Sequence, residues 1–140
     1  MTPYKHAQST AHKFGGCPED YIEVHDWLDC TKQYTGDYTH RALRHHAAGV
    51  QWAIAQFGHS IMNSTGVFVP MKSIVEQHII EDCGFIPMVS DWLSPIKKNP
   101  AAWMLRVKTN KTNELTLQED EEGGKFIPYP FIKATEGEQE

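Results

Sequence analysis

The sequence predicts a mainly α-helical fold: a compact helical bundle built on an antiparallel helical hairpin, with a small β-hairpin and an extended tail at the C-terminus. Long segments lie between clear helix start and stop residues, and only about three or four residues separate the two longest. Apolar residues make up 40% of the 140, which suits one hydrophobic core. We therefore expect a His-rich core domain over residues 1–104 and an extension over residues 105–140.

Two helices are expected in the first half of the chain, after an irregular segment over residues 1–16. Pro18 fits the first position of a helix, and this helix is expected over about residues 18–33. Asp37 is a good N-cap for a longer helix that ends just before Gly58. The two helices form the expected hairpin, so side chains that face inward on one meet the other.

A short strand and a third helix are expected in the middle of the chain. Residues 59–70 have the composition of a loop that contains a short strand at Val67–Val69. A capping-box pattern that begins at Ser73 predicts a helix over about residues 74–82, which ends at Gly84.

The last third of the chain is interrupted by prolines and changes its pattern. Residues 87–93 suggest a short helix or turn that buries Trp92 and Leu93. Alternating apolar residues over 103–117 favour a β-hairpin. The acidic run that follows is expected to be a solvated linker, and the apolar, proline-containing tail is expected to dock on the body.

Composition and charge exclude several classes of protein. The net charge is -5 with histidine neutral, which argues against an extended nucleic-acid surface. No apolar run reaches the roughly 18 residues that cross a bilayer, and the polar N-terminus has no signal-peptide pattern. The three cysteines lack metal-site or disulfide spacing. We expect a cytoplasmic protein without a membrane partner; the oligomeric state stays open.

Histidine is concentrated in one stretch of the chain, because six of the eight lie between His25 and His78. In the first predicted helix, His25, Asp29 and Lys32 share one face, because residues four and seven apart lie on the same side of an α-helix. This polar face either points into the hairpin or is exposed and held by weak ion pairs.

The second predicted helix carries a dense group of basic residues in its first turns. They are His40, Arg41, Arg44, His45 and His46. These groups would repel one another unless an anion, carboxylates or a metal were present. A solvated basic face with one buried histidine is the alternative.

The third predicted helix adds His78 and Asp82 one turn apart, with Glu81 beside them. Imidazole and carboxylate at this spacing can reach one metal ion. A single buried histidine that is satisfied within the core has the same pattern, so the prediction depends on all three helices together.

We expect the three helices to form a site for a divalent ion of zinc, iron or manganese. The expected metal ligands are His25, His45, His46, His78 and Asp82. The expected phosphate-binding residues are Lys32, Arg41 and Arg44, and the expected catalytic residues are Asp29 and Glu81. The pattern predicts a metal-dependent hydrolase of a phosphorylated small molecule or nucleotide, similar to metal phosphohydrolases of the HD type in gathering His and Asp from separate helices.

Two other interpretations explain the same residues. A non-catalytic protein that binds a nucleotide signal or a host protein would hold phosphate directly with Lys32, Arg41, Arg44 and His45. A purely structural network would bond neutral imidazoles to Asp29 and Asp82 without any ligand.

A series of short motifs runs through about residues 4–104. They include His6-Ala-Gln-Ser9, Phe14-Gly-Gly16, His25-Asp-Trp-Leu-Asp29, His40-Arg-Ala-Leu-Arg-His-His46 and Ile86-Pro-Met-Val-Ser-Asp-Trp92. In combination they resemble a family of small phage-associated and bacterial proteins classed as a domain of unknown function. The resemblance implies a phage or mobile-element context, with the host cytoplasm as location if the protein is phage-encoded, and it implies no activity.

His6 and Ser9 in the first of these motifs are three residues apart. In a short helix they would close the site from the N-terminal side. A disordered N-terminal histidine is the alternative.

Overall fold

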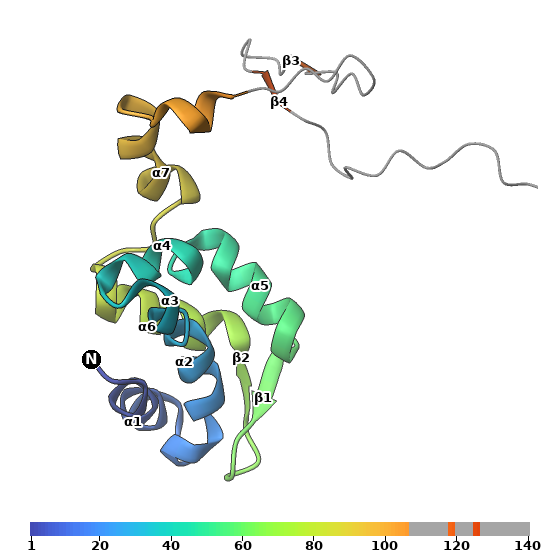
Figure 1. Cartoon of the computed structure of the whole chain (residues 1–140). Helices are drawn as coiled ribbons and strands as arrows, with labels where there is room; N and C mark the ends of the chain where they lie inside the picture. The colour runs from blue at the N-terminus through green and yellow to red at the C-terminus, as the bar shows by residue number, and fades with distance from the viewer. Residues whose placement is uncertain (107–117, 120–124, 127–140) are drawn as a thin grey trace, which may run out of the picture. The chain divides into compact units, whose positions relative to one another are not determined.

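The computed structural model describes residues 1–106, 118–119 and 125–126, and the chain divides into two units, Met1–Asn99 and Pro100–Glu140. The first unit is mainly helical, which confirms the predicted fold class (Figure 1). Its elements are α1 (Pro3–Phe14), η1 (Pro18–Asp20), α2 (Ile22–Asp29), α3 (Lys32–Thr35), η2 (Tyr38–His40), α4 (Arg41–Arg44), α5 (Ala47–Phe57), β1 (Ser60–Met62), β2 (Phe68–Pro70), α6 (Met71–Cys83) and α7 (Val89–Lys98).

The N-terminal segment is helical, so the prediction of an irregular start was wrong. α1 begins at Pro3, where a missing backbone N–H is harmless. The Thr2 side chain caps the helix by accepting a hydrogen bond from Lys5 N at 3.3 Å. Because α1 packs against α2 and α6, it brings His6 close to the histidines of the later helices.

The helix predicted over residues 37–57 is interrupted at His45 and His46, and this prediction was wrong in its middle. His46 has extended backbone angles, φ -161° and ψ 172°, and its side chain caps α5 by accepting from Gly49 N at 3.0 Å. A Cβ at Gly49 would lie 2.7 Å from the carbonyl carbon of Arg44. The turn therefore requires glycine, and the break lets the two neighbouring histidines point to different places.

The remaining elements of the first unit partly follow the predictions. The helix predicted over residues 18–33 is divided into η1, α2 and α3. The main packed pairs of helices are α1 with α2 and α5 with α6. The hairpin is therefore not made by two continuous helices. β1 pairs antiparallel with β2, with Ile61 opposite Val69, so the short predicted strand is confirmed and its partner was missed.

α6 ends before Gly84 as predicted but begins at Met71, earlier than expected. α7 is longer than the predicted short helix or turn. The indole nitrogen of Trp92, which is half-buried, donates to the carbonyl oxygen of His45 at 3.0 Å. Leu93 is 42% exposed, so the prediction of its burial was wrong.

The interior of the first unit combines an apolar core with buried histidines. The buried apolar residues are Ala7, Tyr21, Val24, Leu28, Val50, Ala53, Val69, Met71, Ile74, Val75 and Ile79. Within residues 1–106, the buried histidines are His6, His25, His40, His45, His46 and His78. Buried imidazoles need hydrogen-bond partners or a ligand. The groups around each histidine therefore indicate whether it stabilises the fold or can bind a ligand.

The second unit is described only in part. η3 (Ala102–Leu105) lies where the predicted hairpin was expected to begin, so no strand starts there, and the remainder of that hairpin to residue 117 lies outside the described residues. β3 (Gln118–Glu119) pairs antiparallel with β4 (Lys125–Phe126). The predicted tail beyond β4 also lies outside the described residues, and the domain boundary after residue 104 stays a prediction. Among the described residues, no helix has the length and apolar character needed to span a membrane.

Candidate metal site

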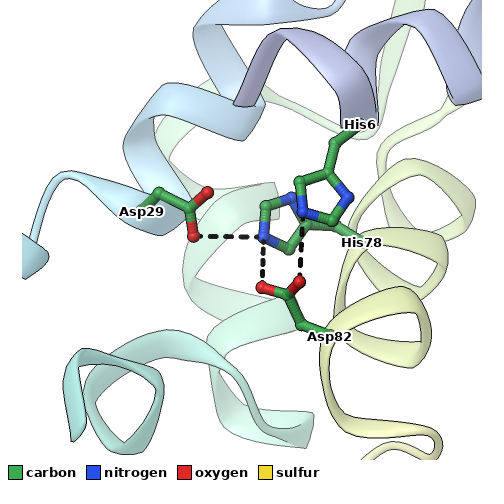
Figure 2. A group of neighbouring side chains, drawn as sticks. All are labelled: His6, Asp29, His78 and Asp82. Carbon is green, nitrogen blue, oxygen red and sulfur yellow. Dashed lines mark ion pairs between the residues drawn. The ribbon is translucent and has the colours of Figure 1, made fainter. Parts of the chain in front are cut away.

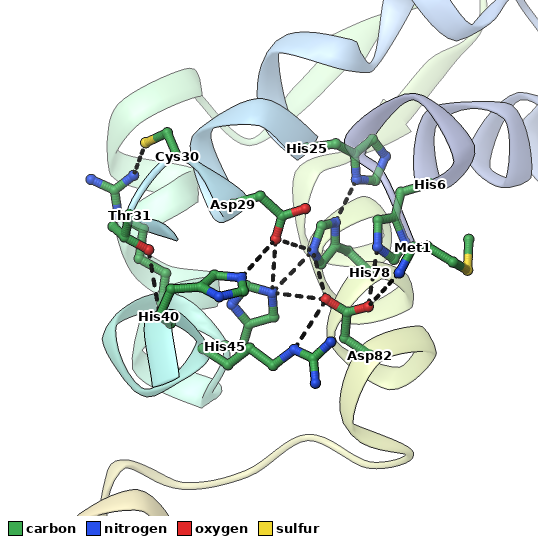
Figure 3. A network of polar contacts seen from close by, with 12 residues as sticks. Met1, His6, His25, Asp29, Cys30, Thr31, His40, His45, His78 and Asp82 are labelled. Carbon is green, nitrogen blue, oxygen red and sulfur yellow. Dashed lines mark hydrogen bonds and ion pairs between the residues drawn. The ribbon is translucent and has the colours of Figure 1, made fainter. Parts of the chain in front are cut away.

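Histidine and aspartate side chains from separate elements of the first unit converge on one point (Figure 3). One of these side chains comes from each of α1, α2, η2 and the residue after α4, and two come from α6. We call these residues the His/Asp cluster; they are His6, Asp29, His40, His45, His78 and Asp82. All four imidazoles are buried, so the cluster lies inside the protein rather than on its surface.

Two imidazoles and two carboxylates form the centre of the His/Asp cluster. His78 Nε2 lies 3.3 Å from Asp29 Oδ1 and 3.5 Å from Asp82 Oδ2. His45 Nε2 lies 3.4 Å and 3.2 Å from the same two oxygens, and 3.0 Å from His78 Nε2. Ligands bound to a divalent ion at about 2.0–2.2 Å stand about 2.8–3.6 Å apart in tetrahedral or octahedral geometry. The separations at the centre fit such an ion.

His6 extends the cluster on the α1 side (Figure 2). Its Nδ1 donates to Glu81 Oε2 at 2.6 Å, while its Nε2 lies 3.2 Å from Asp82 Oδ1. Glu81 is itself fixed, because it accepts hydrogen bonds from Ser9 and Gln77. A carboxylate on one ring nitrogen orients the other nitrogen toward a metal. His6 Nε2 is buried and makes no hydrogen bond among the described residues, although it lies close to Asp82 Oδ1.

His40 extends the cluster on the opposite side. Its Nδ1 donates to the carbonyl oxygen of Asp37 at 2.8 Å, and its Nε2 lies 3.2 Å from Asp29 Oδ1. The short η2 helix makes this possible, because Asp37 caps it and sits three residues before the ring. His40 therefore presents Nε2 to the cluster in the same way as His6.

His25 does not enter the cluster, but its hydrogen bond determines which ring nitrogen of His78 carries the proton. Thr10 donates its hydroxyl proton to the His6 carbonyl oxygen at 3.0 Å, so His25 Nε2 must donate to Thr10 Oγ1, at 2.9 Å. Burial lowers the pKa of His25 to about 3, so its ring carries no second proton. His25 Nδ1 then accepts from His78 Nδ1 at 2.8 Å. His78 Nε2 is left with a lone pair that faces the cluster.

The charges in the cluster favour a cation. Burial alone would raise the pKa of Asp29 and of Asp82, but hydrogen bonds from the histidines, His45 foremost, hold both pKa values well below the usual range. Both carboxylates are therefore ionised. Burial opposes the charged form of His45, but the two aspartates outweigh it and raise the pKa of this ring. Arg41 Nε also approaches Asp82 Oδ2, at 3.5 Å.

A pocket of about 440 Å³ reaches the cluster from outside. Three members of the cluster line it: Asp29, His40 and Asp82. Lys32 and Arg41 line it as well, so two of the three predicted phosphate-binding residues face the same space as the ligands. The exposed Asp26 is another lining residue that the sequence analysis did not single out.

Several predicted site residues lie elsewhere or have another environment. Both ring nitrogens of His46 are engaged at the start of α5, with Gly49 N and the Leu43 carbonyl oxygen, so this histidine is not brought to the cluster. Arg44 lies over the Trp27 ring at 4.1 Å and donates to the Trp27 carbonyl oxygen, away from the pocket. His25, a predicted ligand, contacts His78 rather than the centre of the cluster.

His6 and His40 were absent from the predicted ligands. The spacing of His6 and Ser9 was a signal for a helical N-terminus, and the Thr2-Pro3 start supports it. His40 had no signal of its own, because its position depends on the short η2 turn rather than on a continuous helix.

Comparison with known proteins places the chain in a family. The chain belongs to the family described as Domain of unknown function (DUF6915), which it matches over residues 1–104. This match confirms the resemblance seen in the sequence and includes the whole cluster; the phage context stays a prediction. No curated protein and no solved structure matches the chain.

Proposed function

We propose that this member of the DUF6915 family binds a divalent metal ion at the His/Asp cluster and uses it to hydrolyse a phosphorylated small molecule or nucleotide. One observation supports this most directly: the Nε2 atoms of His45 and His78 lie within 3.5 Å of both Asp29 Oδ1 and Asp82 Oδ2. Imidazole nitrogens combined with carboxylate oxygens suit zinc, iron or manganese.

The direction of the hydrogen bonds gives the cluster a ligand atom for a metal. The chain from Thr10 through His25 leaves a lone pair on His78 Nε2, which faces the ionised Asp29 and Asp82. Buried lone pairs and carboxylates repel one another unless a proton, such as that on His45 Nε2, or a cation lies between them. A divalent cation between them converts these contacts into ligand bonds.

The pocket beside the cluster supports a phosphorylated substrate. Lys32 and Arg41 supply positive charge on the pocket wall, and Arg41 is held near the cluster by Asp82. Guanidinium and ammonium groups are the usual partners of phosphate oxygens. The volume of about 440 Å³ accommodates a small molecule rather than a polymer.

In the proposed reaction a phosphoester is hydrolysed without any change of oxidation state. A bound divalent ion supplies Lewis acidity and a nucleophilic water at neutral pH. The water oxygen bonds to phosphorus, the ester P–O bond breaks, and the alcohol leaves with a proton. Lys32 and Arg41 hold the phosphate oxygens, and Asp26 accepts the proton of the attacking water. Asp29 then acts as a ligand rather than as the base, while Glu81 orients His6.

Elemental analysis of the purified full-length chain tests the metal, and a panel of phosphate monoesters and nucleotides tests the turnover. We expect bound zinc, iron or manganese and phosphate release, with less bound metal and no phosphate release in His45→Ala. His12→Ala is the matched control, because His12 is exposed on α1. Circular dichroism checks that His45→Ala is folded, and Asp82→Asn provides a second variant with the same expected loss.

Two results separate the alternatives. If the protein contains no metal and a chelator leaves its melting temperature unchanged, the metal proposal is wrong. A nucleotide that raises the melting temperature without forming product would favour a non-catalytic binder that uses the same Lys32 and Arg41 pocket.

A further inference from the structure

We propose that the His/Asp cluster holds two divalent ions, each bound by two imidazoles, and that Asp29 and Asp82 bridge them. This inference rests on the proposed metal site and specifies how many ions it takes. The first ion would be bound by His6 and His78, and the second by His40 and His45.

The number of ligands is too large for one catalytic ion. A catalytic zinc site uses three protein ligands and keeps a position open for water or substrate. The cluster offers four imidazoles and two carboxylates, all directed inward (Figure 3). One six-coordinate ion bound to all of them would have no open position, whereas two six-coordinate ions that share the carboxylates would each have four protein ligands and two open positions.

The donor atoms fall into two groups. His6, His78, Asp29 and Asp82 each offer an atom within 4.8 Å of the others, and so do His40, His45 and Asp29. Asp29 belongs to both groups, and its Oδ1 lies 3.2–3.4 Å from three imidazole nitrogens. This placement is typical of a ligand shared by two ions.

Asp82 presents one oxygen to His6 of the first group and the other to His45 of the second, with His78 of the first group also close to that second oxygen. Its Oδ1 lies 3.2 Å from His6 Nε2 (Figure 2), and its Oδ2 lies 3.2 Å from His45 Nε2 and 3.5 Å from His78 Nε2. A carboxylate that presents one oxygen to each side can bridge two ions.

The outer histidines are prepared as ligands, which a single central ion would not require. Glu81 fixes His6 and the Asp37 carbonyl fixes His40, each at Nδ1, so that both Nε2 atoms face the cluster. His6 Nε2 is fully buried and has no hydrogen-bond partner among the described residues. An ion on that side would supply the missing partner.

Two ions also match the chemistry of the proposed substrate. In paired metal sites, both the attacking and the leaving oxygen of a phosphoester are stabilised during in-line displacement. Two divalent ions carry more positive charge than Asp29 and Asp82 neutralise, so the site attracts a phosphate dianion. Phosphate monoesters are therefore the substrate class that we infer.

Titration of the full-length, chelator-stripped chain with Mn²⁺ tests the number of ions. We expect two Mn²⁺ per chain by elemental analysis, with an exchange-coupled electron paramagnetic resonance spectrum. His6→Ala and His40→Ala should each bind one Mn²⁺ and show an uncoupled signal. The control His12→Ala should still bind two, because His12 lies on α1 but outside the cluster.

The wild-type stoichiometry decides the outcome, even if a variant does not fold. Two coupled ions support the inference. One uncoupled ion per chain overturns it and leaves the proposed function standing, whereas no bound Mn²⁺, zinc or iron overturns both. His6→Gln and His40→Gln keep side-chain volume and replace the alanine variants if circular dichroism shows that those are unfolded.

Discussion

Replacing Thr10 with valine tests whether a buried hydrogen-bond chain prepares the metal site. In the wild type, His25 Nε2 donates to Thr10 Oγ1 at 2.9 Å, and His25 Nδ1 accepts from His78 Nδ1 at 2.8 Å. Valine keeps the branched shape but lacks the oxygen, so the single ring proton of His25 is better placed on Nδ1. His78 must then carry its own proton on Nε2, the atom that faces Asp29 and Asp82, and this proton blocks the ligand position.

Two magnitudes follow from this arrangement. Loss of a partner that orients a ligand typically lowers metal affinity about 10–100-fold. In the metal-free protein, the buried His25 Nε2 is left without a hydrogen-bond partner, and an unsatisfied buried polar atom costs about 1–3 kcal/mol of unfolding free energy. His25 is fully buried, so water cannot replace the lost acceptor without a rearrangement.

Calorimetric titration with Zn²⁺ or Mn²⁺ measures the affinity, and urea denaturation after chelation measures the stability. Thr31→Val is the matched control, because the Thr31 hydroxyl is also buried but donates to the His40 carbonyl oxygen at 3.4 Å and contacts no ring nitrogen. We expect Thr31→Val to bind metal as the wild type does. Wild-type affinity in Thr10→Val would refute the argument about the ring protons.

Three further predictions concern stability. Chelation is expected to lower the melting temperature, since metal at 100 times its Kd adds about 2.7 kcal/mol to the unfolding free energy, and an unchanged melting curve would contradict this. Gly49→Ala should lower the unfolding free energy by about 1–3 kcal/mol or more, because its Cβ would lie 2.7 Å from the Arg44 carbonyl carbon; a wild-type denaturation midpoint would show that the turn adapts. Hydrogen bonds from the backbone N–H groups of Ser64 and Cys17 lower the pKa of Asp20 from its ordinary value of 3.8, so the stabilisation is present above that pH and lost as the pH falls through the lower, folded-state pKa. The stability difference between wild type and Asp20→Asn should therefore be constant near neutral pH and shrink in acid, and a difference that persists in strong acid would count against it.

Side-chain chemistry and helical spacing were enough to predict part of the site. His78 and Asp82 are four residues apart on α6, and both belong to the cluster. Asp29, a predicted catalytic residue, and His45, a predicted ligand, also belong to it. These residues could be found because one turn of a helix fixes which side chains share a face.

The errors arose where the backbone departs from regular helix. His45 and His46 are neighbours in the sequence, and only the break before α5 decides that one enters the cluster and the other caps a helix. His40 enters through the η2 turn, and Arg44 is withdrawn from the pocket by its contact with Trp27. Helical periodicity carries no information on such turns, which depend on contacts between distant segments.

The sequence by itself determined the helical class, the C-terminal end of α6, and the concentration of imidazole and carboxylate groups between His25 and Asp82. Only the tertiary structure decided which of these groups meet, because α1, α2 and α6 are brought together by packing of apolar side chains, which helical spacing does not specify. The same packing brings Thr10, His25 and His78 together and so determines which ring nitrogen of His78 carries the proton. The direction of a buried hydrogen bond depends on such partners, which are far apart in the chain.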